Sequence, residues 1–170
     1  MPKIEIFLWQ LLHNALPVRG VLVRWGLNID PACSLCMNDV ESNDCLFWEC
    51  PCIKEMWNLA QHHRWLLLPE IQYGPRCSKN LLFQCKQSRN KEDVVKVAYL
   101  LWHIWKERNA FIFQREIFGP LRTLIRAKRS YAEWGIRTCM PGGYSRGLLH
   151  RRSVSNFIVR WSAPLQESSN

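Results

Sequence analysis

Long apolar runs, a signal-peptide layout and paired aspartates are all missing from this chain of 170 residues. No run of about 18 apolar residues occurs, so the sequence predicts no membrane-spanning helix. Polar Gln10, His13 and Asn14 interrupt the first apolar stretch, which differs from the continuous apolar core of a signal peptide. We therefore expect an intracellular protein of the nucleus or cytoplasm, not a secreted one.

Aspartate is scarce, and this argues against catalysis. The four Asp residues are never adjacent: Asp30, Asp39, Asp44 and Asp93. Phosphodiester chemistry with two magnesium ions needs clustered carboxylates. No pattern in the sequence favours a Ser-His-Asp or Cys-His nucleophile either. We expect no enzymatic activity and no small-molecule substrate.

Apolar residues are abundant: 48% of the chain is hydrophobic, and nine residues are Trp. A chain of this length and composition can bury a real core, so global disorder is not expected. The tryptophans at positions 9, 25, 57, 65, 102 and 105 occur at helical spacing among Leu and Val, which favours core packing over stacking on nucleic-acid bases.

Eight Cys are present, and five of them crowd into residues 33–52. Clustered thiols in a chain without secretory features indicate metal binding. The spacing Cys33-x2-Cys36-x8-Cys45-x4-Cys50 begins with the two-residue gap of a zinc knuckle. We predict that these four thiolates hold one structural zinc ion. A cluster of buried free thiols is the alternative.

Cys45 and Cys50 raise a geometric problem. Five residues of regular helix separate them by about 500°, which is about 140° off a common face. The helix must therefore be irregular near Pro51, or Cys45 must precede it. Cys52, His62 and His63 are rival ligands. Four thiolates around one zinc ion give the site a net negative charge, and the nearby Asp39, Glu41, Asp44 and Glu49 increase it. Backbone N–H groups of the knuckle must therefore offset this charge.

Positive charge is concentrated in the second half of the chain. Residues 1–99 carry 11 Lys or Arg against 10 Asp or Glu, whereas residues 100–170 carry 12 against 4. Arg122, Arg126 and Arg129 follow one stripe of an expected helix, and Lys106 and Arg108 precede them. Such a stripe predicts contact with a phosphate backbone. A solvated helix face explains it equally well.

Periodicity predicts a mainly α fold. The expected helices cover 4–16, ending near Asn14; 18–25, opened by Pro17 and stopped by Gly26; 45–65, with Asp44 as N-cap; 91–114; and 120–136, ended by Pro141. We divide the chain into a small helical zinc-binding domain (1–66), a loop or linker (67–90), a helical connector (91–140) and a poorly ordered basic tail (141–170), which has a strand-like segment at 157–161.

The N-terminal segment contains a characteristic set of residues: Pro2-Lys3-Ile4, Phe7-Leu8-Trp9, His13-Asn14-Ala15-Leu16-Pro17-Val18-Arg19, Leu22, Arg24, Cys33-x2-Cys36, Glu41-Ser42, Leu46-Phe47, Cys50 and Trp57. In this set the segment resembles the zinc-binding domain of plant non-LTR retrotransposon reverse transcriptases. The resemblance covers residues 2–65 strongly. More loosely, Trp102-x2-Trp105-Lys106-x-Arg108-Asn109-x3-Phe113 resembles the connector that precedes a ribonuclease H domain, and Trp161-x2-Pro164 resembles the lead-in to that domain.

The resemblance implies a zinc-binding module that supports binding of RNA or an RNA–DNA hybrid, with reverse transcriptase or ribonuclease H domains as protein partners. The family usually has His where this chain has Cys45. A thiolate in place of the imidazole still suits zinc, so the ion can be retained. If the substitution instead reflects decay of a defunct retroelement, zinc binding is weakened. Both interpretations stay open. Two alternative functions remain: a protein-interaction scaffold that docks through an exposed helix at 91–114, and a retroelement relic without function.

Overall fold

The computed structural model describes residues 2–66 and 91–139 of the chain. The predicted linker at 67–90, the tail at 141–170, the stop at Pro141 and the strand-like segment at 157–161 lie outside the described residues. The same is true of Cys77 and Cys85.

The described residues form helices: α1 (Pro2–Leu12), α2 (Arg19–Arg24), the π-helical turn η1 (Cys45–Glu49), α3 (Pro51–His62), α5 (Lys91–Gln114) and α6 (Pro120–Cys139). Within these two ranges, the extended pairing we find is an isolated antiparallel bridge between Ala32 and Val40. The prediction of a mainly α fold is confirmed.

Helix boundaries follow local backbone chemistry. α1 ends before Asn14, which has a φ of 52°, and α2 ends before Gly26, which has a φ of 91°. Asn and Gly are the residues that adopt this left-handed conformation at least cost. α5 has the bounds expected from periodicity, and α6 continues to Cys139.

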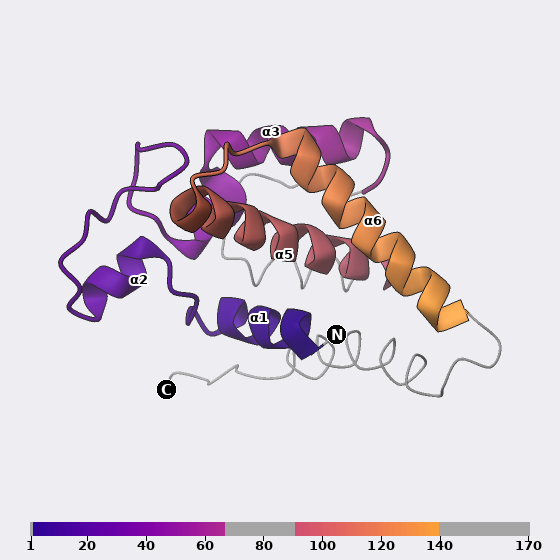
Figure 1. Cartoon of the computed structure of the whole chain (residues 1–170), viewed down its shortest axis with the longest axis horizontal. Coiled ribbons are helices and arrows are strands. Elements are labelled where there is room, and N and C mark those ends of the chain that lie inside the picture. The colour runs from indigo at the N-terminus through magenta and orange to yellow at the C-terminus, as the bar shows by residue number, and fades with distance from the viewer. Residues whose placement is uncertain (1, 67–90, 140–170) are drawn as a thin grey trace, which may run out of the picture.

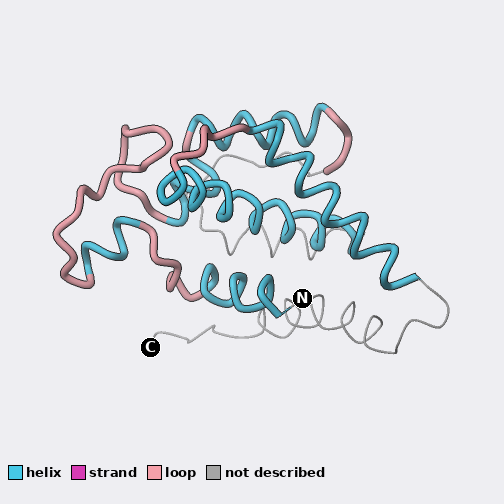
Figure 2. The backbone as a smooth tube through the Cα atoms, in the orientation of Figure 1, coloured by secondary structure: helices cyan, strands magenta, loops and turns pink. Residues whose placement is uncertain are grey.

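Helix α5 is central to the arrangement (Figure 1). α1 packs on one side of α5, and α3 and α6 pack together on the other. α2 and the long loop that carries the first cysteines lie at one end of the molecule, where the tube of Figure 2 is mostly loop. The cysteines are thus placed at the end of the helical layers.

One continuous hydrophobic core joins these layers. Its fully buried side chains come from α1, η1, α3, α5 and α6: Phe7, Leu8, Leu11, Phe47, Ile53, Met56, Leu100, Leu101, Ile104, Leu124 and Ala127. Phe7 touches Phe47 and Trp102 edge-on, with ring centroids 6.0 Å and 5.4 Å apart. Residues of the predicted 1–66 and 91–140 units therefore share this core, while the division into domains stays a prediction.

The tryptophans divide into two groups. Trp57 is buried, donates its indole N–H to the Phe47 carbonyl at 2.8 Å and stacks on Trp48. Trp65, Trp102 and Trp105 are partly buried against the core. Trp9 and Trp25 are 47% and 61% exposed, so core packing was the wrong prediction for these two.

The exposure of Trp9 and Trp25 follows from their positions on the helices. The buried side of α1 is fixed by Ile4, Phe7, Leu8 and Leu11, and Trp9 projects from the other side. Trp25 follows the last residue of α2, and α2 lies at one end of the described helices.

The expectation that helix 91–114 is exposed and available for docking is also wrong. Val97, Ala98, Leu100, Leu101 and Ile104 of α5 have no exposed surface. α5 is in contact with both α1 and α6, so most of its apolar surface is already used inside the molecule.

Gly20 of α2 lies close to Val40 and Glu41, and this close approach predicts that Gly20→Ala strongly destabilises the fold. A Cβ at Gly20 would lie 2.8 Å from the Glu41 carbonyl oxygen and 2.9 Å from Val40 Cγ1. The backbone must then shift, and we expect the free energy of unfolding to fall by about 1–3 kcal/mol in urea titrations followed by circular dichroism.

Gly135→Ala is the matched control, because a Cβ there meets no atom within 4 Å. In the interior of α6 it should raise the free energy of unfolding by about 0.5–1 kcal/mol. Equal effects of the two substitutions would contradict the close approach at Gly20.

Candidate metal centre

The first two cysteines lie in a loop that is closed by its own backbone. In this cysteine loop (residues 31–41), the Cys33 N–H donates to the Asp39 carbonyl at 2.7 Å, and the Met37 N–H donates to the Cys33 carbonyl at 2.8 Å. Met37 has a φ of 57°. This tight turn brings Cys33 and Cys36 to the same side of the loop, as the two-residue spacing predicts.

The other two cysteines lie at the ends of a π-helical turn. The Cys50 N–H donates to the Cys45 carbonyl at 3.0 Å, five residues back. A turn closed in this way brings residues five apart into register, which a regular helix does not. The expected irregularity near Pro51 is therefore present, and Pro51 itself opens α3.

The start of this turn is capped by Ser42, not by Asp44. The Ser42 hydroxyl accepts the Cys45 N–H at 2.9 Å, whereas Asp44 makes no side-chain cap hydrogen bond. The residues before η1 are already helical, so the cap lies two positions earlier than the sequence predicts.

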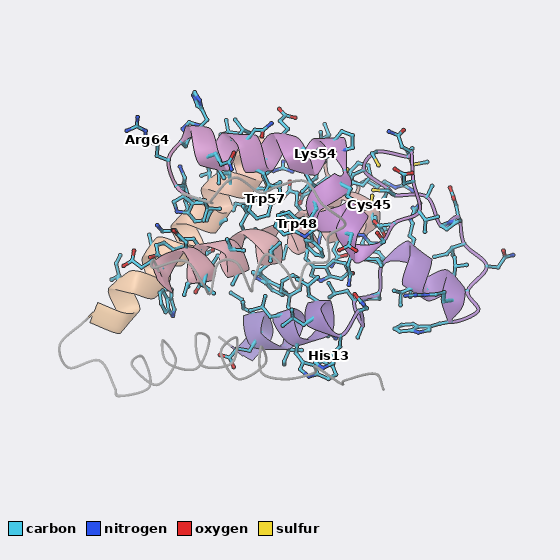
Figure 3. All side chains as sticks on the ribbon, turned by 180° about the vertical axis from the view of Figure 1, so that it is seen from behind. His13, Cys45, Trp48, Lys54, Trp57 and Arg64 are labelled. Carbon is cyan, nitrogen blue, oxygen red and sulfur yellow. The ribbon has the colours of Figure 1, made fainter. Side chains whose placement is uncertain are left out.

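Three predicted ligands converge. The sulfur atoms of Cys33, Cys36 and Cys50 all lie within 4.8 Å of one another. Cys45 is not one of these three, but its thiol interacts with those of Cys33 and Cys50 and shifts their pKa values. In Figure 3 the labelled Cys45 lies beside the other sulfur atoms, where η1 meets the cysteine loop. Three of the four predicted ligands thus converge, and Cys45 as the fourth ligand stays a prediction.

The thiols shift one another's pKa values. Hydrogen bonds with Cys45 and Cys50 lower the pKa of Cys33. The contact with Cys33 raises the pKa of Cys45 and that of Cys50. A metal ion bound by these sulfur atoms would replace thiol protons, because metals bind the deprotonated thiol.

Backbone donors also point at the sulfur atoms. Cys33 receives hydrogen bonds from the N–H groups of Leu35 and Cys36, and Cys50 receives one from the N–H of Cys52. N–H groups in this position offset the negative charge of a thiolate cluster. The donor set therefore fits a metal ion, and soft sulfur ligands are those that zinc accepts.

The rival ligands are placed elsewhere. Cys52 directs its thiol to the Leu35 carbonyl at 3.7 Å. His62 and His63 lie at the far end of α3, which is about 18 Å long at 1.5 Å per residue. Figure 3 shows the neighbouring Arg64 at the end of α3 away from Cys45.

Glu41 is the buried charge next to this site. Its carboxylate has no exposed surface and accepts hydrogen bonds from the Ser34 hydroxyl at 3.0 Å, the Arg19 backbone N–H at 2.8 Å and both Nε and Nη2 of Arg108. Arg108 comes from α5. Glu41 was expected to add negative charge to the thiolates, but this ion pair neutralises it.

Arg108 is fully occupied by these contacts. It is 3% exposed, its guanidinium lies over the Trp105 ring at 5.2 Å, and its Nη1 donates to Asn109 Oδ1 at 3.0 Å. A buried and paired guanidinium is not open to a phosphate. The prediction that Arg108 contacts nucleic acid is therefore replaced by a structural role.

The other predicted basic residues lie near the surface of α5 and α6. Arg122 and Arg126 both pair with buried Glu107, and Arg129 pairs with Glu133. The side chains of Arg122, Arg126 and Arg129 remain 42%, 49% and 81% exposed, and Lys106 is exposed as well. These four residues keep surface that a polyanion can reach.

The comparisons with known proteins agree with the site. Residues 1–57 match the family model zf-RVT, described as zinc-binding in reverse transcriptase. The match and the cysteine cluster together fit a zinc-binding domain. No curated protein and no solved structure matches the chain. In the described residues, no helix is both long and apolar enough to span a membrane.

The sulfur cluster predicts different outcomes for Cys45→Ala and Cys52→Ala. Cys45→Ala removes a thiol that contacts two others, so we expect loss of about one bound zinc per chain together with loss of helical signal. Metal content by mass spectrometry and circular dichroism measure both.

Cys52→Ala is the control, because its thiol bonds only a carbonyl in the described structure. It should keep both metal and fold. A Cys45→Ala protein with unchanged metal content and chelator resistance would rule out Cys45 as a ligand.

The buried ion pair predicts a large cost for Arg108→Met. This change leaves the Glu41 carboxylate buried without its cation, and we expect a loss of about 3–5 kcal/mol in the free energy of unfolding. Arg129→Met, which removes the exposed pair with Glu133, should cost about 1 kcal/mol or less. Denaturant titration compares the two, and similar costs would show that Glu41 does not depend on Arg108.

Proposed function

We propose that this chain is a non-catalytic, zinc-stabilised module of a reverse transcriptase that supports binding of nucleic acid, RNA or an RNA–DNA hybrid. The convergence of Cys33, Cys36 and Cys50 within the segment that matches the zinc-binding family model is the observation that carries the proposal. The four Asp residues of the sequence are never adjacent, which supports a non-catalytic role.

Zinc has a structural role in this proposal. Cys33, Cys36, Cys45 and Cys50 would hold it, and their backbone donors support the charged thiolates. Four protein ligands complete a tetrahedral site and leave no position for a reacting water. The ion joins the cysteine loop to η1, and its binding free energy adds to that of folding.

The finer assignments rest on sequence. Resemblance to plant non-LTR retrotransposon enzymes supports that origin, with α5 and α6 as the connector before a ribonuclease H domain. The direct contacts of α5 with α1 and of α6 with α3 support a connector that folds with the zinc-binding segment. Free thiols at Cys33, Cys36, Cys45, Cys50 and Cys52 support a reducing compartment, the nucleus or cytoplasm.

The proposed nucleic-acid surface consists of Lys106, Arg122, Arg126 and Arg129. Their exposed side chains lie on two adjacent helices. Glu107 and Glu133 hold the arginines in place and neutralise part of their charge. This partial neutralisation favours weak binding that depends on phosphate charge and tolerates any sequence.

Salt dependence tests this proposal. We expect the affinity for a single-stranded RNA oligonucleotide, and for an RNA–DNA hybrid, to fall steeply as salt rises in filter-binding assays. Replacement of Arg122, Arg126 and Arg129 by Gln should reduce the slope of log K against log salt by about 2–3, since each lost phosphate contact removes about 0.7–0.9.

Arg24→Gln is the control, because Arg24 is exposed on α2, away from α6. It should leave the slope unchanged. Binding that does not vary with salt, or an equal effect of the control, would reject this surface.

A further inference from the structure

Helix α6 has three distinct faces. One face is buried against its neighbours and contains Thr123, Leu124, Ala127 and Trp134. A second face carries the arginines at 122, 126 and 129. A third face, between these two, is apolar and exposed.

The exposed apolar face is a stripe of three aliphatic residues. Leu121, Ile125 and Ile136 are 50%, 56% and 59% exposed. At about 100° per residue they fall within an arc of about 60° on one side of α6. An aligned stripe of this kind is typical of helix–helix contacts, whereas scattered single exposed residues are normal for any surface.

The apolar surface continues beyond the start of α6. Phe113, near the end of α5, and Ile117, in the turn between α5 and α6, are 76% and 84% exposed. The Arg122 side chain donates to the Ile117 carbonyl, which fixes this turn against the first residues of α6. This hydrogen bond therefore fixes the backbone of the turn that carries Ile117.

Positive charge borders the stripe. Lys128 and Arg129 are next to it on the helix, and Arg129 is 81% exposed. In residues 120–136 four Lys or Arg stand against one acidic residue, Glu133. At about 100° per residue Lys128 and Arg129 lie on opposite edges of the stripe, so a partner that covers the aliphatic residues meets a cation at each edge.

We propose that the stripe of Leu121, Ile125 and Ile136 is a docking site for an amphipathic helix with acidic edges, supplied by another protein or domain. The apolar side of the partner helix covers the three aliphatic residues, and its Glu or Asp residues lie beside Lys128 and Arg129. Apolar contact supplies affinity, and the charges set orientation and partner choice.

Other occupants fit less well. A second copy of α6 would bring Lys128 and Arg129 near the same cations of its neighbour. Nucleic acid gains little from the stripe, because bases stack on aromatic rings and these three side chains have none. A lipid surface would contact only the exposed stripe, because the other apolar face of α6 is buried in the core.

A designed peptide tests the proposal with the full chain in its zinc-bound form. The probe is a fluorescein-labelled helix of about three heptads with Leu at a and d and Glu at e and g, whose own copies repel one another at pH 7. We expect saturable binding by fluorescence anisotropy, and affinity at least about tenfold weaker for the same peptide with Lys at e and g.

Variants of the chain locate the site. Ile125→Gln should weaken binding of the Glu peptide at least about tenfold, as loss of a central apolar anchor does. Ile6→Gln on α1 is the matched control, because Ile6 is 58% exposed against 56% for Ile125, and it should have no effect. Arg129→Gln should weaken binding and reduce its salt dependence.

Several results would overturn the proposal. No binding of the Glu peptide, equal binding of both peptides, or equal effects of Ile125→Gln and Ile6→Gln would each reject the docking site. A dimer in sedimentation that Ile125→Gln dissociates would assign the stripe to a second copy. Binding to phosphatidylcholine–phosphatidylserine vesicles that Ile125→Gln abolishes would assign it to a membrane. RNA binding should be unchanged in Ile125→Gln, so the two proposals can fail separately.

Discussion

The carboxylate of Glu41 is completely removed from water, and the arrangement around it follows from that fact. A buried charge is stable only when a counter-charge and hydrogen-bond donors satisfy it, and Arg108, Ser34 and the Arg19 backbone do so from three parts of the chain. These contacts fix the cysteine loop against α2 and α5. The core fixes the position of Arg108, and the ion pair with Arg108 fixes Glu41. Because Glu41 is the last residue of the cysteine loop, the ion pair also holds the loop.

The thiol cluster depends on two departures from regular backbone. Met37 adopts a left-handed conformation in the cysteine loop, and η1 is wound as a π-turn between Cys45 and Cys50. Irregular turns of this type are costly unless their surroundings support them. Here the Ser42 cap, the loop hydrogen bonds and the buried Phe47 support them, and a metal held by the four sulfur atoms would do so further.

The two sides of α6 outside the core serve different proposed partners. Arg122 and Arg126 are both drawn to Glu107, so their charge is partly used to hold α6 on α5. What remains is a modest positive surface suited to phosphates, and beside it an aliphatic stripe suited to a helix. The two proposed partners would thus occupy neighbouring faces of the same helix.

The sequence by itself determined the helices and the identity of the thiols. Periodic apolar residues fixed α5 to its end residues, and Gly26 fixed the end of α2, because these signals are local. The Cys spacing selected the cluster for the same reason. Only the tertiary structure decided which charges and tryptophans are buried. Glu41 and Arg108 are 67 residues apart, and Trp9 differs from Trp57 only in what packs on it, so no local pattern distinguishes them. Such outcomes depend on which helix faces meet, and that is settled by the packing of the whole core.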